Sequence, residues 1–147
     1  VEQVGVTGIS LGGYTASLLA CVEDRLEFSI PNVPVVSLID LMFQWYPASL
    51  LIKTALKVGN IPTSDVRHLM AVHCPLTYKP VLPRERLMII GGAGDRLSPP
   101  KQVRILWEHW DGCPIHWFPG NHVIHLEQGR YLKEVLGFFD NIGFKPV

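Results

Sequence analysis

The sequence predicts an α/β fold, a parallel sheet of about four strands with helices packed on its faces. Short apolar runs that are typical of buried strands alternate along the chain with longer segments of helical periodicity. No internal repeat or low-complexity linker interrupts this alternation, and 147 residues with 48% hydrophobic content suit one domain with a sizeable core. Strands that alternate with helices form βαβ units, which place the strands in parallel.

The amino-terminal part of the chain predicts a strand, a tight turn and a helix. Val4, Val6 and Ile9 give the first segment the character of a buried strand, and residues 11–23 are mostly helix formers. A second strand is expected over residues 27–39, where two prolines shorten or kink it.

Two helices are expected between the second and third strands. Pro47 begins the first, over residues 47–59, and Gly59 can end it. The second, over residues 63–73, begins with capping side chains and stops before Pro75. Residues 38–78 carry more apolar side chains than one packed helix requires, namely Leu41, Met42, Phe43, Trp45, Tyr46, Leu50, Leu51 and Ile52.

The carboxyl-terminal part predicts two further strands, each followed by a helix. Residues 86–90 form a short buried strand, and Ser98 with two prolines begins an amphipathic helix that runs to residue 110. Residues 113–118 are the fourth strand, and a final helix over residues 126–143 ends at a glycine. The side chains of the final helix that are expected to face the sheet are Leu132, Val135, Leu136 and Phe139.

Charge and composition exclude several classes of function. The chain has 13 basic and 13 acidic side chains, without a cluster of lysine and arginine that could hold nucleic acid or an anionic membrane. No apolar stretch is long enough to span a bilayer. The cysteines, Cys21, Cys74 and Cys113, are too scattered for a disulfide framework, so we expect free and mostly buried thiols.

We expect neither a metal nor a nucleotide cofactor. His68, His73 and Cys74 lack the spacing of a structural zinc site, and so does the pair of histidines at 122 and 125. The glycine-rich residues 91–95 are not followed by the lysine and hydroxyl residue of a phosphate-binding loop. The first residue is a valine inside a strand-like run, so we expect that the sequence is a piece of a longer protein.

Residues 8–12 carry the pattern Gly-x-Ser-x-Gly between the first predicted strand and the first predicted helix. In that context the pattern is typical of a nucleophilic serine in a strained turn, which lifts the Ser10 hydroxyl above the sheet edge. Gly8 and Gly12 are expected to avoid the clash that a Cβ atom would cause there. The N–H of Leu11, at the start of the helix, can stabilise an oxyanion. The alternative is that the glycines only let the helix pack closely on the strand.

A serine nucleophile needs a histidine base and a carboxylate that orients the base. Asp95 and His122 fit these roles, because each lies in a loop that directly follows a predicted strand. The rival base is His125, and the rival acid is Asp40, which can equally cap a helix. Asp65 and Asp111 lie where helix-cap and turn residues are expected.

The serine, acid, histidine order and the surrounding segments resemble the carboxyl-terminal half of the α/β-hydrolase superfamily, from its fifth strand to its last helix. Residues 8–20 resemble the nucleophile elbow, and residues 118–122 resemble the histidine loop. Residues 74–100 are similar to the acid-bearing segment of the dienelactone-hydrolase and prolyl-oligopeptidase-like esterase branch. The roles that the resemblance implies are nucleophile for Ser10, orienting acid for Asp95, general base for His122 and one oxyanion donor for Leu11.

The resemblance implies three further features. In that superfamily a second oxyanion N–H comes from a loop after the third strand, outside this sequence, so we expect the isolated chain to be inactive. The first strand, within residues 3–9, is expected to have an unpaired edge that pairs with another copy or with a missing amino-terminal half. Residues 38–78 are expected to form a helical insertion or lid, with Trp45 and Tyr46 in the substrate pocket; an ordinary helix packed on the sheet is the alternative.

The predicted reaction is hydrolysis of a carboxylic ester through an acyl-enzyme on Ser10. An apolar lid favours a small apolar ester as the substrate. Peptides, lactones and thioesters are alternative substrates for the same chemistry. A hydrolase-like protein that binds ligands or acts as a scaffold, without catalysis, is the alternative from a different class.

Overall fold

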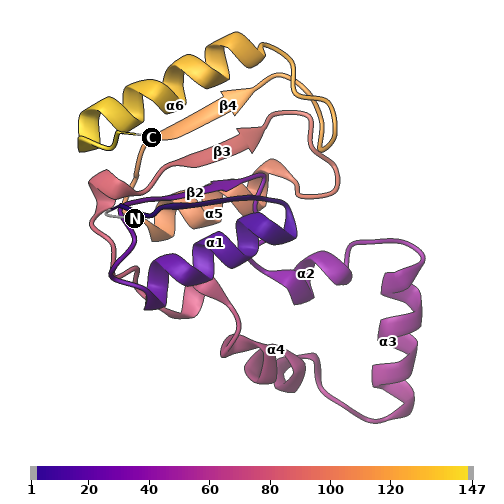
Figure 1. The fold of residues 1–147 in the computed structure, drawn as a ribbon. Helices are drawn as coiled ribbons and strands as arrows, with labels where there is room; N and C mark the ends of the chain where they lie inside the picture. Colours follow the sequence, from indigo (N-terminus) through magenta and orange to yellow (C-terminus); the bar gives the residue numbers. More distant parts are fainter. Residues whose placement is uncertain (1–2, 146–147) are drawn as a thin grey trace.

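The computed structural model describes residues 3–145 (Figure 1). Its strands and helices follow the predicted order, except that three α-helices and not two separate the second strand from the third. The strands and α-helices are β1 (Val6–Ile9), α1 (Leu11–Val22), β2 (Ser29–Asn32), α2 (Leu38–Met42), α3 (Ala48–Val58), α4 (Thr63–Ala71), β3 (Ile89–Gly92), α5 (Pro100–His109), β4 (Ile115–Phe118) and α6 (Gln128–Ile142). Two short 3₁₀ turns, η1 (Pro75–Thr77) and η2 (Arg84–Arg86), lie between α4 and β3.

The four strands form one parallel sheet in the order β1-β2-β3-β4. With its flanking helices, this sheet confirms the predicted α/β fold. Because all the strands run in the same direction, the loops that follow their carboxyl ends lie along one edge of the sheet. β1 is an outer strand, and β2 is its one partner within residues 3–145.

Helices cover both faces of the sheet (Figure 1). α1 and α5 pack on one face, where Ala20 and Leu106 join Ile89 in a hydrophobic cluster. α6 packs on the other face, where Phe138 joins Ile90. Ile89 and Ile90 are neighbours in β3 and are both fully buried, so the side chains of this strand alternate between two covered faces.

The second strand is short, as its prolines predict. β2 spans Ser29–Asn32, which is only part of the predicted range 27–39, and α2 begins within that range at Leu38. Val33 still donates its N–H to the carbonyl of Ile90 at 2.8 Å, but its φ of 40° turns the chain out of the sheet. Pro34 follows and has no N–H for a further ladder bond, so the strand cannot continue.

The predicted sheet-facing stripe of α6 is right for Val135 and Phe139 and wrong for the two leucines. Leu132 and Leu136 are each 55% exposed, so their assignment to the buried face is wrong. The side chains of α6 that are buried or packed against the sheet-side cluster are Tyr131, Val135, Phe138, Phe139 and Ile142. This set buries the large aromatic rings of the helix, which contribute more apolar area than the leucines do.

Three helices, α2, α3 and α4, separate β2 from β3 and extend away from the sheet (Figure 1). Leu41 in α2 is fully buried, whereas no residue of α3 or α4 is buried. These helices lie within residues 38–78, and their role as an insertion or a lid stays a prediction.

The three cysteines form no disulfide in the described chain. Burial raises the pKa of Cys21 to about 11 and the pKa of Cys113 to about 12. Both side chains are therefore protonated thiols at neutral pH and poor nucleophiles. Within residues 3–145 no helix combines the length and the apolar character that crossing a membrane requires.

Candidate active site

Ser10 occupies a strained turn between β1 and α1. Its φ of 57° and ψ of −111° lie in a region that residues with a side chain rarely adopt. The turn is fixed from both sides, because the Ser10 N–H donates to the carbonyl of Asn32 at 2.9 Å and the Ser10 carbonyl accepts the N–H of Tyr14 at 3.0 Å. Leu11 is the first residue of α1, so its N–H has no acceptor within the helix.

The crowded glycines around Ser10 are Gly8 and Gly13. A Cβ atom on Gly8 would lie 2.3 Å from the carbonyl oxygen of Gly12. A Cβ atom on Gly13 would lie 2.8 Å from the carbonyl oxygen of Asn32. A Cβ atom on Gly12 would meet nothing within 4 Å, so the steric reason predicted for this glycine is wrong. Glycine is required at position 8 because a side chain there would clash with the backbone of Gly12.

We expect Gly8→Ala to lower the free energy of unfolding by roughly 1–3 kcal/mol, because the backbone around Ser10 must shift to admit a methyl group. Gly12→Ala is the matched control, since it adds the same methyl group in open space on α1. It should change stability by less than about 1 kcal/mol, in the stabilising direction. Urea denaturation of the two variants makes the comparison, and equal destabilisation would contradict this view of the turn.

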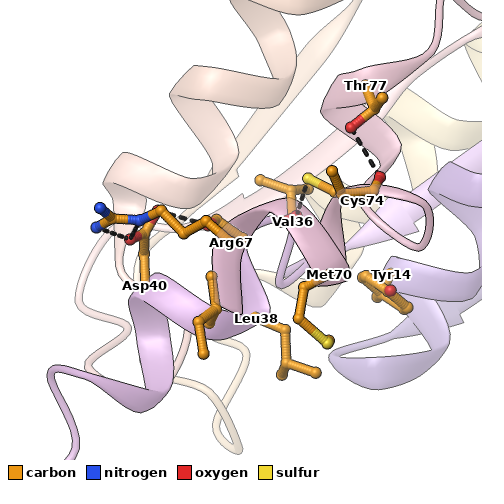
Figure 2. Close-up of a pocket in the computed structure, with 11 residues that line it drawn as sticks. Tyr14, Val36, Leu38, Asp40, Arg67, Met70, Cys74 and Thr77 are labelled. Carbon is orange, nitrogen blue, oxygen red and sulfur yellow. Dashed lines mark hydrogen bonds and ion pairs between the residues drawn. The ribbon is translucent and has the colours of Figure 1, made fainter. Parts of the chain in front are cut away.

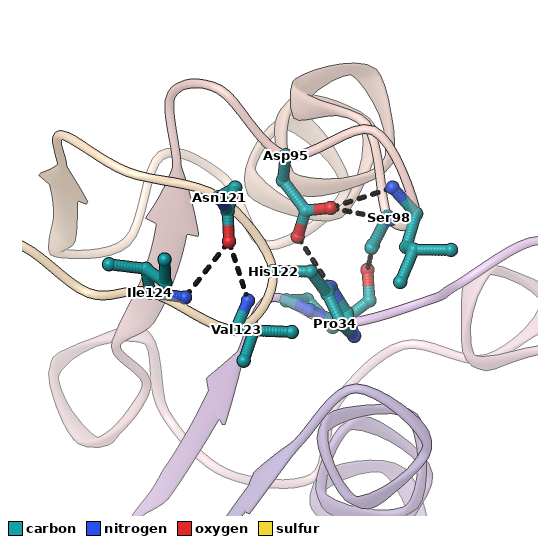
Figure 3. A network of polar contacts seen from close by, with 8 residues as sticks. Pro34, Asp95, Ser98, Asn121, His122, Val123 and Ile124 are labelled. Atoms are coloured by element: carbon teal, nitrogen blue, oxygen red, sulfur yellow. Dashed lines mark hydrogen bonds and ion pairs between the residues drawn. The ribbon is translucent and has the colours of Figure 1, made fainter.

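Asp95 lies in the loop after β3 with its carboxylate fully buried (Figure 3). One carboxylate oxygen, Oδ1, accepts the backbone N–H groups of Leu97 at 2.8 Å and Ser98 at 2.9 Å. The other, Oδ2, lies 2.6 Å from Nδ1 of His122. Both oxygens of this carboxylate therefore have donors, and the side chain is held in one orientation.

His122 lies in the loop after β4, which is ordered by its own hydrogen bonds (Figure 3). The side chain of Asn121 accepts the N–H groups of Val123 and Ile124, both at 2.9 Å. Gly120 has a φ of 146°, and a Cβ atom there would lie 2.1 Å from the carbonyl oxygen of Ile124. Its carbonyl accepts the N–H of Gly94, which joins this loop to the acid loop.

These supporting residues are not among those predicted from the sequence, although the Pro-Gly-Asn-His turn contained the signal. Glycine is the residue that a φ of 146° favours, and an asparagine side chain readily bonds backbone N–H groups two and three residues ahead. Both features point to a tight turn immediately before the histidine.

His122 reaches across the sheet edge toward β1. A cavity of about 290 Å³ is lined by Ile9, the last residue of β1, and by both histidines of the loop after β4. Ile9 directly precedes Ser10 in the chain, although Ser10 itself is not among the residues that line this cavity. The Ser10 hydroxyl makes no hydrogen bond to His122 in the described chain. Nε2 of His122 is the ring nitrogen that Asp95 leaves unengaged.

The two rival residues have other contacts. The ring of His125 stacks on Phe118 with the ring centroids 3.8 Å apart, and burial lowers its pKa. Asp40 lies in α2, where it accepts the hydroxyl of Ser37 at 2.7 Å and pairs with Arg67 at 2.6 Å. The hydrogen bond from Ser37, with the Arg67 charge, lowers the pKa of Asp40. The structure therefore places Asp95, and not Asp40, on the imidazole.

Trp45 and Tyr46 are not among the residues that line the cavities beside α1 and beside His122, and their place in a substrate pocket stays a prediction. Both lie between α2 and α3, and Tyr46 is 83% exposed. The cavity beside α1 is lined instead by residues such as Leu38, Met70 and Tyr14. Asp65 lies in the first turn of α4, and Asp111 in the turn after α5, as their settings predict. No group of three metal-ligating side chains comes together in residues 3–145.

Comparisons with known proteins agree with this architecture. No family model matches the chain. An uncharacterized protein of Mycobacterium tuberculosis is 36% identical over 126 residues, which cover 81% of this chain and 28% of that protein. A puromycin-hydrolyzing peptidase of Mycobacterium tuberculosis superposes with a TM-score of 0.70 at 17% identity, over 97% of this chain and 22% of that one.

Two archaeal structures superpose in the same way. An acylaminoacyl peptidase of Pyrococcus horikoshii gives a TM-score of 0.69 at 16% identity, over 95% of this chain and 24% of that chain. An esterase of Pyrococcus furiosus gives a TM-score of 0.63 at 16% identity, over 95% of this chain and 53% of that chain. The chain has the α/β-hydrolase fold. This confirms the fold that the resemblance implies, while the esterase branch stays a prediction.

The chain spans about a quarter of the length of the curated relative, and 22% to 53% of these three α/β-hydrolase structures. In the α/β-hydrolase fold seen here, Ser10, Asp95 and His122 follow β1, β3 and β4 at one edge of the parallel sheet.

Proposed function

We propose that the protein to which this chain belongs is a serine hydrolase that cleaves carboxylic esters through an acyl-enzyme on Ser10. The observation that carries this proposal is the buried Asp95 carboxylate 2.6 Å from Nδ1 of His122, at the sheet edge where Ser10 is held in a strained turn. The solved structures with the same fold include an esterase and two peptidases, which supports acyl transfer as the reaction class.

In the proposed mechanism the Ser10 oxygen attacks the ester carbonyl carbon while Nε2 of His122 takes the hydroxyl proton. Asp95 holds the proton on Nδ1 and stabilises the imidazolium. The N–H of Leu11 donates to the oxyanion. The C–O bond to the alcohol then breaks, and His122 returns its proton to the leaving oxygen. A water molecule, deprotonated by Nε2 of His122, attacks the acyl carbon. The bond from that carbon to the Ser10 oxygen then breaks, and His122 returns the proton to this oxygen, which releases the acid and restores Ser10.

An apolar substrate fits the cavity beside α1. This cavity, of about 190 Å³, is lined by Leu38 and Ile39 of α2, by Met70 of α4 and by Tyr14, one turn beyond Ser10 (Figure 2). The pair of Asp40 and Arg67 closes one end of it. We propose that α2 to α4 act as the lid over this cavity and that its apolar lining selects apolar acyl or alcohol groups.

Full-length protein tests the function against p-nitrophenyl esters of increasing acyl length and against the matching p-nitroanilides. We expect a burst of p-nitrophenol equal to the enzyme concentration, because p-nitrophenol is a good leaving group and acylation is then faster than hydrolysis of the acyl-enzyme. Hydrolysis of the anilides alone would overturn the ester assignment.

The missing hydrogen bond from Ser10 to His122 favours a second candidate, a binding protein without catalysis. Binding of these esters without release of p-nitrophenol would support it.

We propose that catalysis requires more of the protein than this chain, because within residues 3–145 Leu11 supplies one oxyanion donor and β1 is paired on one side only. Val6 donates its N–H to Phe28, directly before β2, and Ser10 donates to Asn32 at the end of β2. The N–H groups of Thr7 and Ile9 therefore face away from β2. Such an edge binds another strand. The partner is the remainder of the longer protein or a second copy of the chain.

Light scattering with size-exclusion chromatography tests the open edge. The isolated 147-residue chain is expected to elute as an oligomer or to aggregate, because an uncovered strand edge pairs with other chains. Full-length protein is the control, in which the edge is covered. A stable monomer of 16.5 kDa from the isolated chain would contradict the proposal.

A further inference from the structure

Two buried polar side chains at the start of α5 lie outside the proposed triad and bond to the same short segment. Ser98 and Gln102 both reach residues 33–37, which connect β2 to α2. The Ser98 hydroxyl donates to the carbonyl of Pro34 at 2.7 Å. The Gln102 side-chain oxygen accepts the N–H groups of Val36 at 3.0 Å and Ser37 at 2.9 Å. Side chains therefore supply hydrogen bonds that neither a helix nor a sheet supplies here.

Ser98 also belongs to the acid loop. Its backbone N–H donates to Oδ1 of Asp95 at 2.9 Å, while its hydroxyl donates to Pro34 (Figure 3). One residue thus joins the carboxylate that holds His122 to the segment after β2. The Ser98 side chain is fully buried, so water cannot replace either bond without a change in the loop.

The same segment contacts the serine turn from its other side. Ser10 donates its N–H to Asn32, at the end of β2. The Cβ position of Gly13 lies 2.8 Å from the carbonyl oxygen of Asn32 and 3.1 Å from Cα of Pro34, so the first turn of α1 rests directly on this backbone. A displacement of Pro34 would therefore move Ser10 relative to Asp95.

Gln102 bonds to the later part of residues 33–37. The residues whose N–H groups it accepts, Val36 and Ser37, line the cavity beside α1 (Figure 2). Gln102 is buried and is joined to Ser98 by one turn of chain, so the two side chains hold successive parts of one segment. We call this pair the clamp.

We infer that Ser98 and Gln102 are positioning residues for the proposed hydrolysis, Ser98 by aligning the Asp95 and His122 pair with Ser10, and Gln102 by fixing the backbone that walls the substrate cavity. This inference rests on the proposed function. Catalytic groups that act in concert lose about 10²-fold in rate for a displacement near 1 Å, so a clamp of this kind has a measurable effect.

Kinetics of full-length variants with p-nitrophenyl esters separate the two roles. Ser98→Ala is expected to lower kcat about 10- to 100-fold with KM within twofold. Gln102→Met removes the acceptor at similar volume and should raise KM about tenfold. Gln102→Glu keeps the acceptor oxygen and should restore KM. Ser29→Ala is the matched control. The buried hydroxyl of Ser29 lies at the start of β2, the end far from Ser10, and donates to the carbonyl of Ala16 in α1. This variant should lose stability without a loss of kcat.

The ¹H NMR resonance of the His122 Nδ1 proton gives a readout that does not need turnover. A proton in a short bond to a carboxylate is strongly deshielded. We expect Ser98→Ala to shift or broaden this resonance and Ser29→Ala to leave it unchanged. If Ser98→Ala does not fold, Ser98→Cys keeps the volume with only a weak donor and serves instead.

A wild-type resonance and wild-type kcat in the Ser98 variant would overturn the inference, and so would a wild-type KM for Gln102→Met. If wild-type protein hydrolyses no ester, the proposed function fails by itself. The NMR comparison then still decides whether Ser98 aligns the pair.

Discussion

Replacing Ser10 with alanine is expected to lower kcat of the full-length protein by about 10⁴- to 10⁶-fold. The variant keeps the fold, because a methyl group fits wherever a serine side chain fits, but no oxygen remains to form the acyl-enzyme. The burst of p-nitrophenol should disappear together with the steady-state rate. Initial rates and stopped-flow bursts measured on the two proteins at one concentration make the comparison.

Ser29→Ala is the control for Ser10→Ala, because it removes a serine hydroxyl at the opposite end of the sheet. A Ser10→Ala protein that keeps the burst would show that another residue carries the acyl group. A Ser10→Ala protein with a lost burst and an unchanged unfolding midpoint would tie the loss to the hydroxyl and not to stability.

Asp95→Asn is the second change with a large expected effect, a fall in kcat of about 10⁴-fold. Asparagine can still accept the N–H groups of Leu97 and Ser98 with its oxygen, since Oδ1 makes both bonds. Its NH₂ group then faces Nδ1 of His122, which must become an acceptor. The imidazole proton moves to Nε2, where it prevents the ring from taking the proton of Ser10. Steady-state kinetics at pH 7 measure this loss.

Two other aspartates provide the comparison for Asp95. Asp40→Asn, at the rival acid, is expected to lower kcat by less than about tenfold, because Asp40 bonds Ser37 and Arg67 and not the imidazole. Asp65→Asn, on an exposed position of α4, should leave kcat unchanged. A larger loss in Asp40→Asn than in Asp95→Asn would assign the orienting acid to Asp40.

Much of the fold could be predicted because local patterns determine it. Apolar runs and helical periodicity identify the four strands and most of the helices, and parallel strands bring their carboxyl ends to one edge. That rule alone places the loops of Ser10, Asp95 and His122 at the same edge, and the structure shows the contact between Asp95 and His122.

The errors arose where the deciding contact is distant in sequence. The range predicted for β2 extends too far, because Val33 turns out of the sheet while still bonded to Ile90. In α6, Tyr131, Phe138 and Ile142 contact the sheet-side cluster, whereas the sequence pattern predicts Leu132 and Leu136 there. The bond from Ser98 to Pro34 joins residues 64 positions apart, and no local pattern predicts it. The crowding at Gly13 likewise depends on the path of the chain after β2.

The position of the covalent adduct with a fluorophosphonate tests the central claim most directly. Full-length protein is treated with the probe, digested with trypsin and analysed by mass spectrometry. We expect one phosphonylated residue, Ser10, on the peptide that ends at Arg25, and no adduct in His122→Ala, where the base is absent. An adduct on a different serine, or none on folded protein that hydrolyses esters, would contradict Ser10 as the nucleophile.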